Sequence, residues 1–156
     1  YIIPFEKLYK EGYRGVIFDI DNTLVPHGAP ADKRAKELFG RLESIGFATC
    51  LISNNQEPRV KMFNEEIGTR YIFNARKPAR KNYIRAMEMM ETDRTNTIFV
   101  GDQLFTDVWG AKRAGIRNIL VKPMYPKEEI QIVLKRYLER IVLYFYKRKQ
   151  RMTREE

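Results

Sequence analysis

The chain is poor in the residues that hold most disulfide and zinc sites. Its 156 residues include a single cysteine, Cys50, and a single histidine, His27. One cysteine excludes an internal disulfide framework and a multi-cysteine zinc site. One histidine excludes the paired-histidine helix motif of zinc proteases. Carboxylates and other oxygen groups are therefore the metal ligands to look for in this sequence.

Long apolar runs are absent, and acidic residues are outnumbered by basic ones. No run of about 18 apolar residues is present, the length that a membrane-spanning helix needs, and the first residues show no charged-then-apolar secretion signal. Lys and Arg number 29 against 20 Asp and Glu, so the formal net charge is +9. A positive chain favours phosphate-rich partners such as nucleic acid, anionic lipid or a phosphorylated small molecule. We expect a cytoplasmic protein, with peripheral residence on the inner face of the membrane as the alternative.

Short apolar segments alternate with amphipathic segments along the chain. Strands are expected at residues 16–18, 47–52, 71–73, 97–100 and 118–121. Helices are expected to begin near residues 32, 58, 78 and 106, and a last helix is expected over 126–149. Such alternation is typical of a parallel sheet with helices on both faces. We therefore predict an α/β fold, a three-layer Rossmann-like five-stranded parallel sheet, in one domain over residues 1–156.

Polar side chains follow four of the expected strands, and ligands of such sheets bind beyond the carboxyl ends of the strands. Carboxylates placed close together repel one another unless a cation lies among them, and Mg²⁺ is a hard cation that prefers oxygen ligands. A lysine and a serine hydroxyl beside that cation could hold the oxygens of a phosphoryl group. The residues in question are Asp19, Asp21, Thr23, Ser53, Asn54, Lys77, Asp102 and Asp107.

These segments resemble the four motifs of the haloacid dehalogenase (HAD) superfamily. DIDNT at residues 19–23 is similar to the DxDxT motif, Ser53 to the second motif, Lys77 to the third, and GDQLFTD at residues 101–107 to the GDxxxxD motif. The sequence segments DIDNTL, SNN, KP and GDQLFTD also resemble those of the YqeG-type branch, the type IIIA phosphatases. That branch is similar to the phosphatidylglycerophosphate phosphatases of mitochondria and chloroplasts. The resemblance covers nearly the whole chain.

The resemblance implies a role for each matching residue. Asp19 would attack phosphorus and form an aspartyl-phosphate, and Asp21 would protonate the leaving oxygen and then deprotonate the hydrolytic water. The implied ligands of Mg²⁺ are Asp19, Asp21 through its main-chain carbonyl, Asp102 and Asp107. The implied substrate-binding residues are Thr23, Ser53, Asn54 and Lys77, with Arg76, Arg80 and Lys81 as alternatives for the lysine.

The gaps between motifs leave no room for the cap domain that many members of the superfamily carry. Only 29 residues lie between Thr23 and Ser53, and 23 lie between Ser53 and Lys77. One helix and one strand fill each gap. We therefore expect an open site with the loop over residues 25–30 as its rim. An open site excludes water poorly and suits a phosphate presented on a bilayer, a protein or a nucleic-acid end.

The C-terminal segment adds a partner hypothesis. The expected helix over 126–149 ends in apolar and aromatic residues and is followed by a basic tail. Such a helix can pack on the sheet, or its basic end can contact an anionic membrane. The sequence leaves both alternatives open, and it also leaves the oligomeric state open.

Three functional hypotheses follow. The leading one is a Mg²⁺-dependent phosphomonoesterase that acts on a large or membrane-presented substrate, with phosphatidylglycerophosphate as the candidate. The second is a phosphatase for nucleic-acid ends or phosphoproteins, which the positive charge also favours. The third is a non-catalytic module that binds RNA or ribosomes on the same scaffold.

Overall fold

The computed structural model describes residues 3–124 and residue 139. The chain divides into two compact units, residues 1–124 and residues 125–156, and the first is described here by itself. The predicted helix over 126–149 and the basic tail lie outside the described residues, except for Glu139. A single domain over 1–156 stays a prediction. Within the described part of the chain, no helix is long and apolar enough to cross a membrane.

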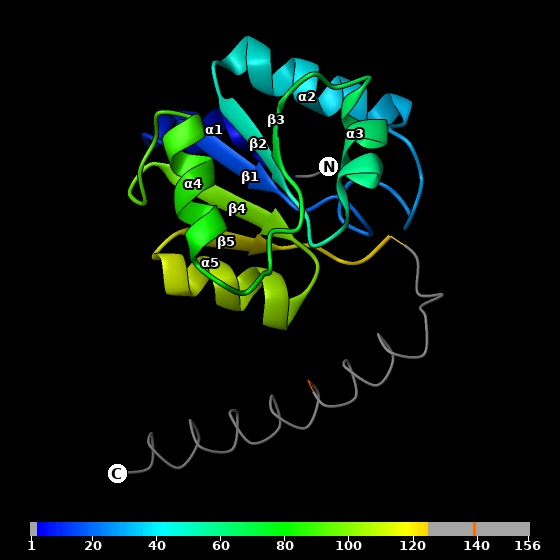
Figure 1. The fold of residues 1–156 in the computed structure, drawn as a ribbon. Helices are drawn as coiled ribbons and strands as arrows, with labels where there is room; N and C mark the ends of the chain where they lie inside the picture. The colour runs from blue at the N-terminus through cyan, green and yellow to red at the C-terminus, as the bar shows by residue number, and fades with distance from the viewer. Residues whose placement is uncertain (1–2, 125–138, 140–156) are drawn as a thin grey trace. The chain divides into compact units, whose positions relative to one another are not determined.

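Five parallel strands form one sheet in the order β3-β2-β1-β4-β5 (Figure 1). The central strand β1 (Gly15–Phe18) pairs with β2 (Ala48–Ile52) on one side and β4 (Thr97–Gly101) on the other. The edges are β3 (Arg70–Ile72) and β5 (Arg117–Leu120). The predicted α/β fold is confirmed, and every strand end lies within one residue of its predicted position.

Helices cover both faces of the sheet, so the core has two halves (Figure 1). Successive side chains of a strand point to opposite faces. Val16 and Phe18 pack on one face, and Ile17 packs on the other. Residues of the first three helices share a core with Val16, and residues of the last two share a core with Ile17. The helices are α1 (Phe5–Lys10), α2 (Lys33–Ile45), α3 (Glu57–Asn64), α4 (Lys81–Met89) and α5 (Trp109–Ala114).

The sequence explains both ends of helix α2, but it does not reveal helix α1. The Asp32 side chain accepts a hydrogen bond from the Ala35 amide at 2.7 Å and caps the start of α2. Gly46 ends the same helix at φ 103°, a conformation that glycine adopts without strain. The short helix α1 was absent from the sequence prediction, because six residues are too few to show helical periodicity. Its fully buried Phe5 anchors it to the core.

Two other helix predictions need correction. The helix expected from residue 78 begins at Lys81, because the Ala79 amide bonds the Arg76 carbonyl at 2.9 Å and closes a separate turn first. The helix expected from residue 106 has two parts, a π-helix η1 (Leu104–Val108) followed by α5. The amides of Asp107 and Val108 both bond the Gln103 carbonyl, at 2.9 and 3.2 Å, which widens this turn.

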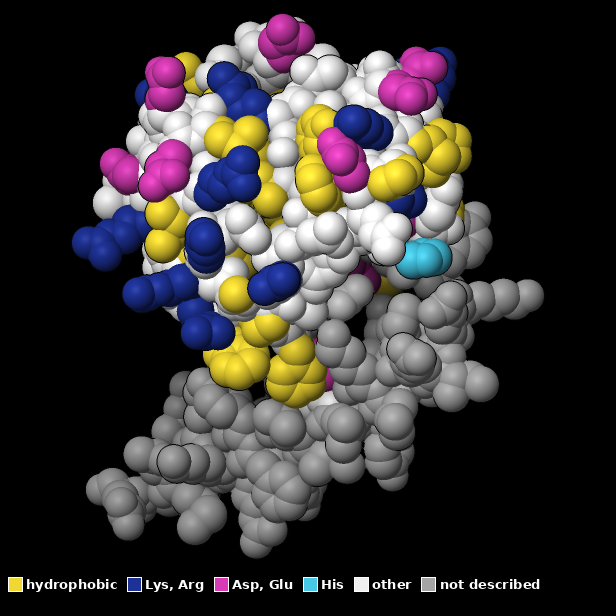
Figure 2. All heavy atoms as spheres, in the orientation of Figure 1, with side chains coloured by type: hydrophobic (Ala, Val, Ile, Leu, Met, Phe, Trp, Pro, Cys, Tyr) yellow, Lys and Arg dark blue, Asp and Glu magenta, His cyan; other side chains and the backbone are white. Residues whose placement is uncertain are grey.

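Basic side chains gather on the surface over α4 and α5. Figure 2 shows Lys and Arg side chains clustered on this side of the molecule. Positive charge is therefore not confined to the C-terminal segment. We call this surface the α4–α5 basic face; its exposed members are Arg80, Lys81, Arg85, Arg94, Lys112 and Arg113.

The contact between Gly110 and Tyr83 gives a stability prediction. A Cβ at Gly110 would lie 2.3 Å from Tyr83 Oη and 2.6 Å from Cζ, and Tyr83 is fully buried. We expect Gly110→Ala to lower the free energy of unfolding by about 1–3 kcal/mol, the usual cost of overpacking. Urea denaturation measures the change.

Gly40→Ala is the matched control, because nothing lies within 4 Å of a Cβ at that helical position. We expect it to raise the free energy of unfolding by up to about 1 kcal/mol through helix propensity. Equal effects of the two substitutions would contradict the packing argument.

Candidate active site

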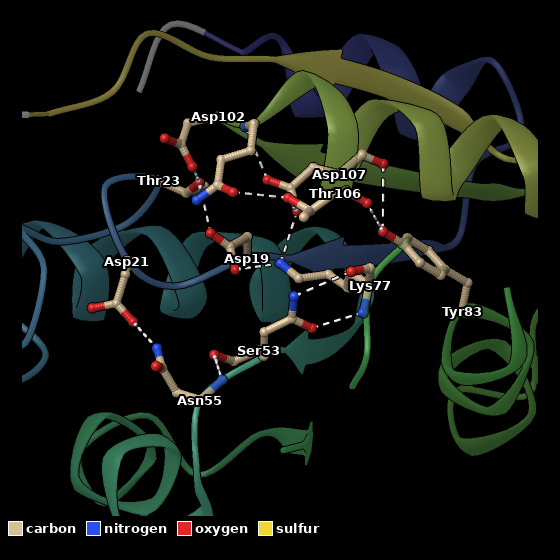
Figure 3. Close-up of polar contacts among 12 residues, drawn as sticks. Asp19, Asp21, Thr23, Ser53, Asn55, Lys77, Tyr83, Asp102, Thr106 and Asp107 are labelled. Carbon is tan, nitrogen blue, oxygen red and sulfur yellow. Dashed lines mark hydrogen bonds and ion pairs between the residues drawn. The ribbon is translucent and has the colours of Figure 1, made fainter. Parts of the chain in front are cut away.

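The polar residues predicted at the strand ends converge on one edge of the sheet. Figure 3 shows Asp19 beyond β1, Ser53 beyond β2 and Asp102 beyond β4, with Lys77 entering from the segment that leads to α4. All four are buried, with exposed fractions of 2–7%. The parallel sheet brings these segments together because every strand ends on the same side.

A lysine ammonium lies between two carboxylates at the centre of the site. Lys77 Nζ donates to Asp19 Oδ1 at 2.5 Å and to Asp107 Oδ1 at 2.7 Å (Figure 3). Burial opposes the charge of Lys77, but Asp107 and Asp19 raise its pKa well above the ordinary value. The lysine is therefore a fixed positive charge at the bottom of the site. Among the basic residues weighed for this role, Lys77 is buried here, whereas Arg76, Arg80 and Lys81 are exposed.

Three carboxylates are close enough to share one metal ion. One oxygen from each of Asp19, Asp102 and Asp107 lies within 4.8 Å of the others. Burial raises the pKa of the Asp19 carboxyl to about 7; Lys77 opposes this rise, and Asp107 and Asp102 add to it. A buried set of three carboxylates fits a hard divalent cation, because oxygen ligands and negative charge are what Mg²⁺ requires. The predicted metal ligands Asp19, Asp102 and Asp107 are thus brought together.

A tight turn after β1 places Thr23 over this cluster. Asn22 has φ 62°, a left-handed conformation in which asparagine is well tolerated. Thr23 Oγ1 lies 3.1 Å from Asp102 Oδ1 and 3.4 Å from Asp19 Oδ2, so its hydroxyl donates to one carboxylate at a time. Thr23 links the first and fourth motifs.

The small residue Gly101 lets Asp107 reach the site. A Cβ at Gly101 would lie 2.4 Å from Asp107 Oδ2, which is closer than any real contact. The same Oδ2 accepts a hydrogen bond from the Gln103 amide at 3.0 Å. Tyr83 Oη donates to the Thr106 carbonyl at 2.7 Å and holds the π-helix that carries Asp107. Asp107 thus has a fixed direction, and it is fully buried.

The second motif supplies a hydroxyl and an amide with different tasks. Ser53 Oγ accepts from the Asn55 amide at 3.1 Å, so its own proton is available to a phosphoryl oxygen. The Asn54 side chain accepts from the Lys77 amide at 2.7 Å and donates to the Lys77 carbonyl at 3.2 Å. Asn54 therefore holds the backbone of the lysine, and a contact between Asn54 and substrate stays a prediction.

Asp21 is held apart from the other predicted site residues. Its carboxylate points toward Asn55 and away from Asp19 (Figure 3). Asn55 Nδ2 donates to Asp21 Oδ2 at 2.6 Å, and the Gly28 amide donates to Oδ1 at 2.8 Å. Arg59 forms an ion pair with the same Oδ1 at 2.9 Å. The site therefore has two polar clusters, one around Asp19 and one around Asp21.

Sequence reasoning missed three of these residues. Asn55 and Arg59 contact Asp21, and Tyr83 contacts the π-helix. Asn55 follows directly after the second motif, which is a signal that could have found it. Arg59 lies in the first turn of α3 with no motif around it, and Tyr83 looked like an ordinary core residue of α4.

The loop over residues 25–30 lies beside Asp21, and the lone thiol lies in the core. His27 lies in the loop over residues 25–30 with its side chain 56% exposed, and Nδ1 is 3.7 Å from Asp21 Oδ1. Among the described residues no inserted domain separates the motifs, as predicted. Cys50 is fully buried in the core, and burial raises the pKa of its thiol to about 12, which excludes it as a nucleophile.

Comparison with known proteins identifies the family. A family model described as HAD-hydrolase-like matches residues 74–123. The chain is 40% identical over 152 residues to the "Probable phosphatase YqeG" of Bacillus subtilis (strain 168), covering 97% of this chain and 88% of that protein. The chain belongs to the haloacid dehalogenase superfamily. It is a HAD-type phosphatase, similar to the YqeG branch, and the resemblance seen in its motifs is confirmed.

Other similarities are more distant. The "Phosphatidylglycerophosphate phosphatase 1, chloroplastic/mitochondrial" of Arabidopsis thaliana is 28% identical over 156 residues, which cover 94% of this chain and 44% of that protein. A solved HAD phosphatase from Thermococcus onnurineus is 15% identical with a TM-score of 0.56, covering 75% of this chain and 89% of its own. A solved hydrolase from Pseudomonas syringae is 12% identical with a TM-score of 0.59, covering 69% and 83%. These two structures support the fold.

The raised pKa of Asp19 gives a prediction for metal binding. The pKa of the Asp19 carboxyl rises from its usual 3.8 to about 7 in the folded chain, so ionising Asp19 opposes folding. The free energy of unfolding of the metal-free protein therefore falls as pH rises between those values. A cation needs the carboxylate form and competes with the proton. We expect the affinity for Mg²⁺ to fall below pH 7, by up to about tenfold per pH unit for one displaced proton. Calorimetric titration from pH 5.5 to 8.5 measures this.

Asp19→Asn is the control for this titration. The amide has no proton to lose, so the remaining affinity should depend less on pH. A flat profile in the unsubstituted protein would contradict the assignment of the raised pKa to a metal-binding Asp19.

Proposed function

We propose that the chain is a Mg²⁺-dependent phosphomonoesterase that works through a covalent intermediate on Asp19, with phosphatidylglycerophosphate as its substrate. The observation that carries the proposal is the buried cluster in which Lys77 Nζ lies 2.5 Å from Asp19 Oδ1 while Asp102 and Asp107 complete a set of three carboxylates. Such a cluster joins a nucleophile, a fixed cation and a metal-binding set in one place.

The residues suit a two-step displacement. An Asp19 oxygen attacks phosphorus, the bond to the leaving alcohol oxygen breaks, and Asp21 gives its proton to that oxygen. Asp21 then takes a proton from water, whose oxygen attacks phosphorus and releases Asp19 and inorganic phosphate. Lys77 and the Ser53 hydroxyl neutralise the transferring oxygens throughout. Thr23 orients the carboxylates of Asp19 and Asp102 by its hydroxyl.

The metal would be held by Asp19, Asp102 and Asp107, with the main-chain carbonyl of Asp21 as a further ligand. When bound, Mg²⁺ would neutralise negative charge on the phosphoryl group and on the attacking carboxylate. The raised pKa of Asp19 supports this role, because burial and the neighbouring carboxylates of Asp107 and Asp102 together outweigh the positive charge of Lys77.

A lipid substrate is supported by three features. The Arabidopsis relative is a phosphatidylglycerophosphate phosphatase by name. No inserted domain closes the site in the described part of the chain. The α4–α5 basic face supplies positive charge for an anionic bilayer. Peripheral contact through the C-terminal helix is a separate proposal that concerns residues outside those described.

The same basic face keeps a second candidate in view, a phosphatase for nucleic-acid ends. Clustered Lys and Arg also suit a phosphate backbone. Turnover of phosphatidylglycerophosphate in vesicles, a 5′-phosphorylated oligonucleotide and a phosphopeptide, each with and without Mg²⁺, separates these alternatives. We expect the lipid to be hydrolysed fastest and each activity to need Mg²⁺. Preference for the oligonucleotide would favour the second candidate.

Asp19→Asn tests the mechanism. Loss of the nucleophile should lower kcat by at least about 10⁴-fold, and Asp21→Asn should lower it by about 10²–10⁴-fold, the usual contribution of general acid–base catalysis. An aryl phosphate in Mg²⁺ is a suitable first substrate. Circular dichroism confirms that both variants are folded. Turnover by Asp19→Asn at the unsubstituted rate would show that the mechanism is wrong.

A further inference from the structure

Arg59 is a largely buried arginine beside the proposed acid–base residue, and one nitrogen of its guanidinium makes no hydrogen bond within the described part of the chain. Its Nη2 and Nε both approach the same oxygen, Asp21 Oδ1, at 2.9 and 3.3 Å. Its Nη1 is buried and has no hydrogen-bond partner among the described residues. A guanidinium has five N–H donors in a fixed fork, and a buried donor without a partner costs free energy. Arg59 is thus placed for an acceptor that the described chain does not provide.

Asp21 does not need Arg59 to satisfy its carboxylate. The Gly28 amide donates to Oδ1 at 2.8 Å and Asn55 Nδ2 donates to Oδ2 at 2.6 Å. In this arrangement the carboxylate points toward Asn55 rather than toward Asp19 (Figure 3). To act on a leaving oxygen at Asp19, the Asp21 side chain must leave these donors. The ion pair with Arg59 acts together with these two donors to hold Asp21 in a resting position.

The position of Arg59 also determines which part of a substrate can contact its guanidinium. In the proposed reaction the leaving oxygen must come within hydrogen-bond reach of Asp21, roughly 2.6–3.2 Å. Arg59 Nη2 already lies 2.9 Å from Asp21. Asp21 turns from Arg59 to the leaving oxygen by movement of its own side chain, so groups a few bonds beyond that oxygen, on the alcohol half of the substrate, come close to the guanidinium. The imidazole of His27, 3.7 Å from the same carboxylate oxygen, lies on the same side of the site.

We propose that Arg59 binds a second phosphate group, carried by the alcohol half of the substrate, and that this binding draws Arg59 from Asp21 and removes one of the contacts that keep Asp21 from the leaving oxygen. The fork of a guanidinium can bind two oxygens of a phosphate at once. The contact with Asp21 uses this capacity only in part, because two nitrogens of Arg59 share one carboxylate oxygen. The inference rests on the proposed phosphomonoesterase function and names its substrate class: a monoester that carries a second phosphate. That phosphate is either a diester, as in a lipid headgroup, or a second monoester.

Three soluble substrates test the proposal. Glycerol 3-phosphate has one phosphate, glycerophosphoglycerol phosphate adds a diester, and propane-1,3-diol bisphosphate adds a second monoester. We expect the unsubstituted protein to prefer at least one of the last two by kcat/KM. In Arg59→Ala that preference over glycerol 3-phosphate should fall about 10- to 100-fold, the value of one or two hydrogen bonds to a charged group. Arg59→Lys should restore part of it, because the charge returns without the fork.

Lys61→Ala is the matched control on the same helix. Lys61 is 56% exposed and pairs with Glu57 at 3.0 Å, so the substitution removes one positive charge from α3 away from Asp21. The preference of Lys61→Ala for a substrate with a second phosphate over glycerol 3-phosphate should equal that of the unsubstituted protein. Thermal unfolding checks each variant, and Arg59→Gln replaces Arg59→Ala if the latter does not fold.

The outcomes separate the two proposals. A loss of preference for the diester alone identifies a lipid-type headgroup, and a loss for the bisphosphate alone identifies a free second phosphate; both support the role of Arg59. If Arg59→Ala lowers all three activities equally, the second-phosphate site is wrong while the phosphatase proposal stands. If the unsubstituted protein hydrolyses none of the three in Mg²⁺, both proposals are wrong.

Discussion

The ammonium of Lys77, enclosed by the carboxylates of Asp19 and Asp107, is the interaction on which the site depends. Each of these charges would be costly to bury alone: Lys77 offsets part of the desolvation penalty of the carboxylates, and the carboxylates keep the lysine charged. The lysine comes from the segment before α4, and the carboxylates come from the ends of β1 and the π-helix. One ion-paired cluster therefore ties three distant parts of the sequence together and leaves a net negative charge for a cation to complete.

Two acids that stand two residues apart serve separate clusters. The strand β1 ends at Phe18, and the left-handed Asn22 turns the chain soon afterwards. Asp19 remains at the strand end against Lys77, whereas Asp21 points to Asn55 and the first turn of α3. This division suits the proposed roles, in which the nucleophile Asp19 stays fixed and the proton carrier Asp21 moves. The backbone conformation, rather than the spacing in the sequence, sets how far apart the carboxylates of Asp19 and Asp21 lie.

The strands and the Asp19 cluster could be predicted from the sequence because their signals are local. Strands buried on both faces appear as short apolar runs, and each motif follows such a run directly. Asp32 and Gly46 mark the ends of α2 in the same local way. The parallel topology then dictates that the strand ends meet, so Asp19, Lys77 and Asp102 could be placed together without coordinates.

The remaining features depend on contacts that no local pattern contains. The π-helix arises from two amides sharing the Gln103 carbonyl, which apolar spacing does not reveal. Arg59 looks like any surface arginine of a helix until α3 is seen beside Asp21. The direction of the Asp21 carboxylate and the bracing of Lys77 by Asn54 are likewise tertiary facts.

The position of β1 at the centre of the sheet has a consequence for synthesis on the ribosome. Gly15 of β1 pairs with Thr97 of the neighbouring strand β4. One edge of β1, the first strand to emerge, therefore stays unpaired until most of the chain has been made. The carboxylates of Asp102 and Asp107 emerge later still. A nascent chain that already displays Asp19, Ser53 and Lys77 therefore lacks two of the three carboxylates of the cluster until β4 and the π-helix have joined the sheet.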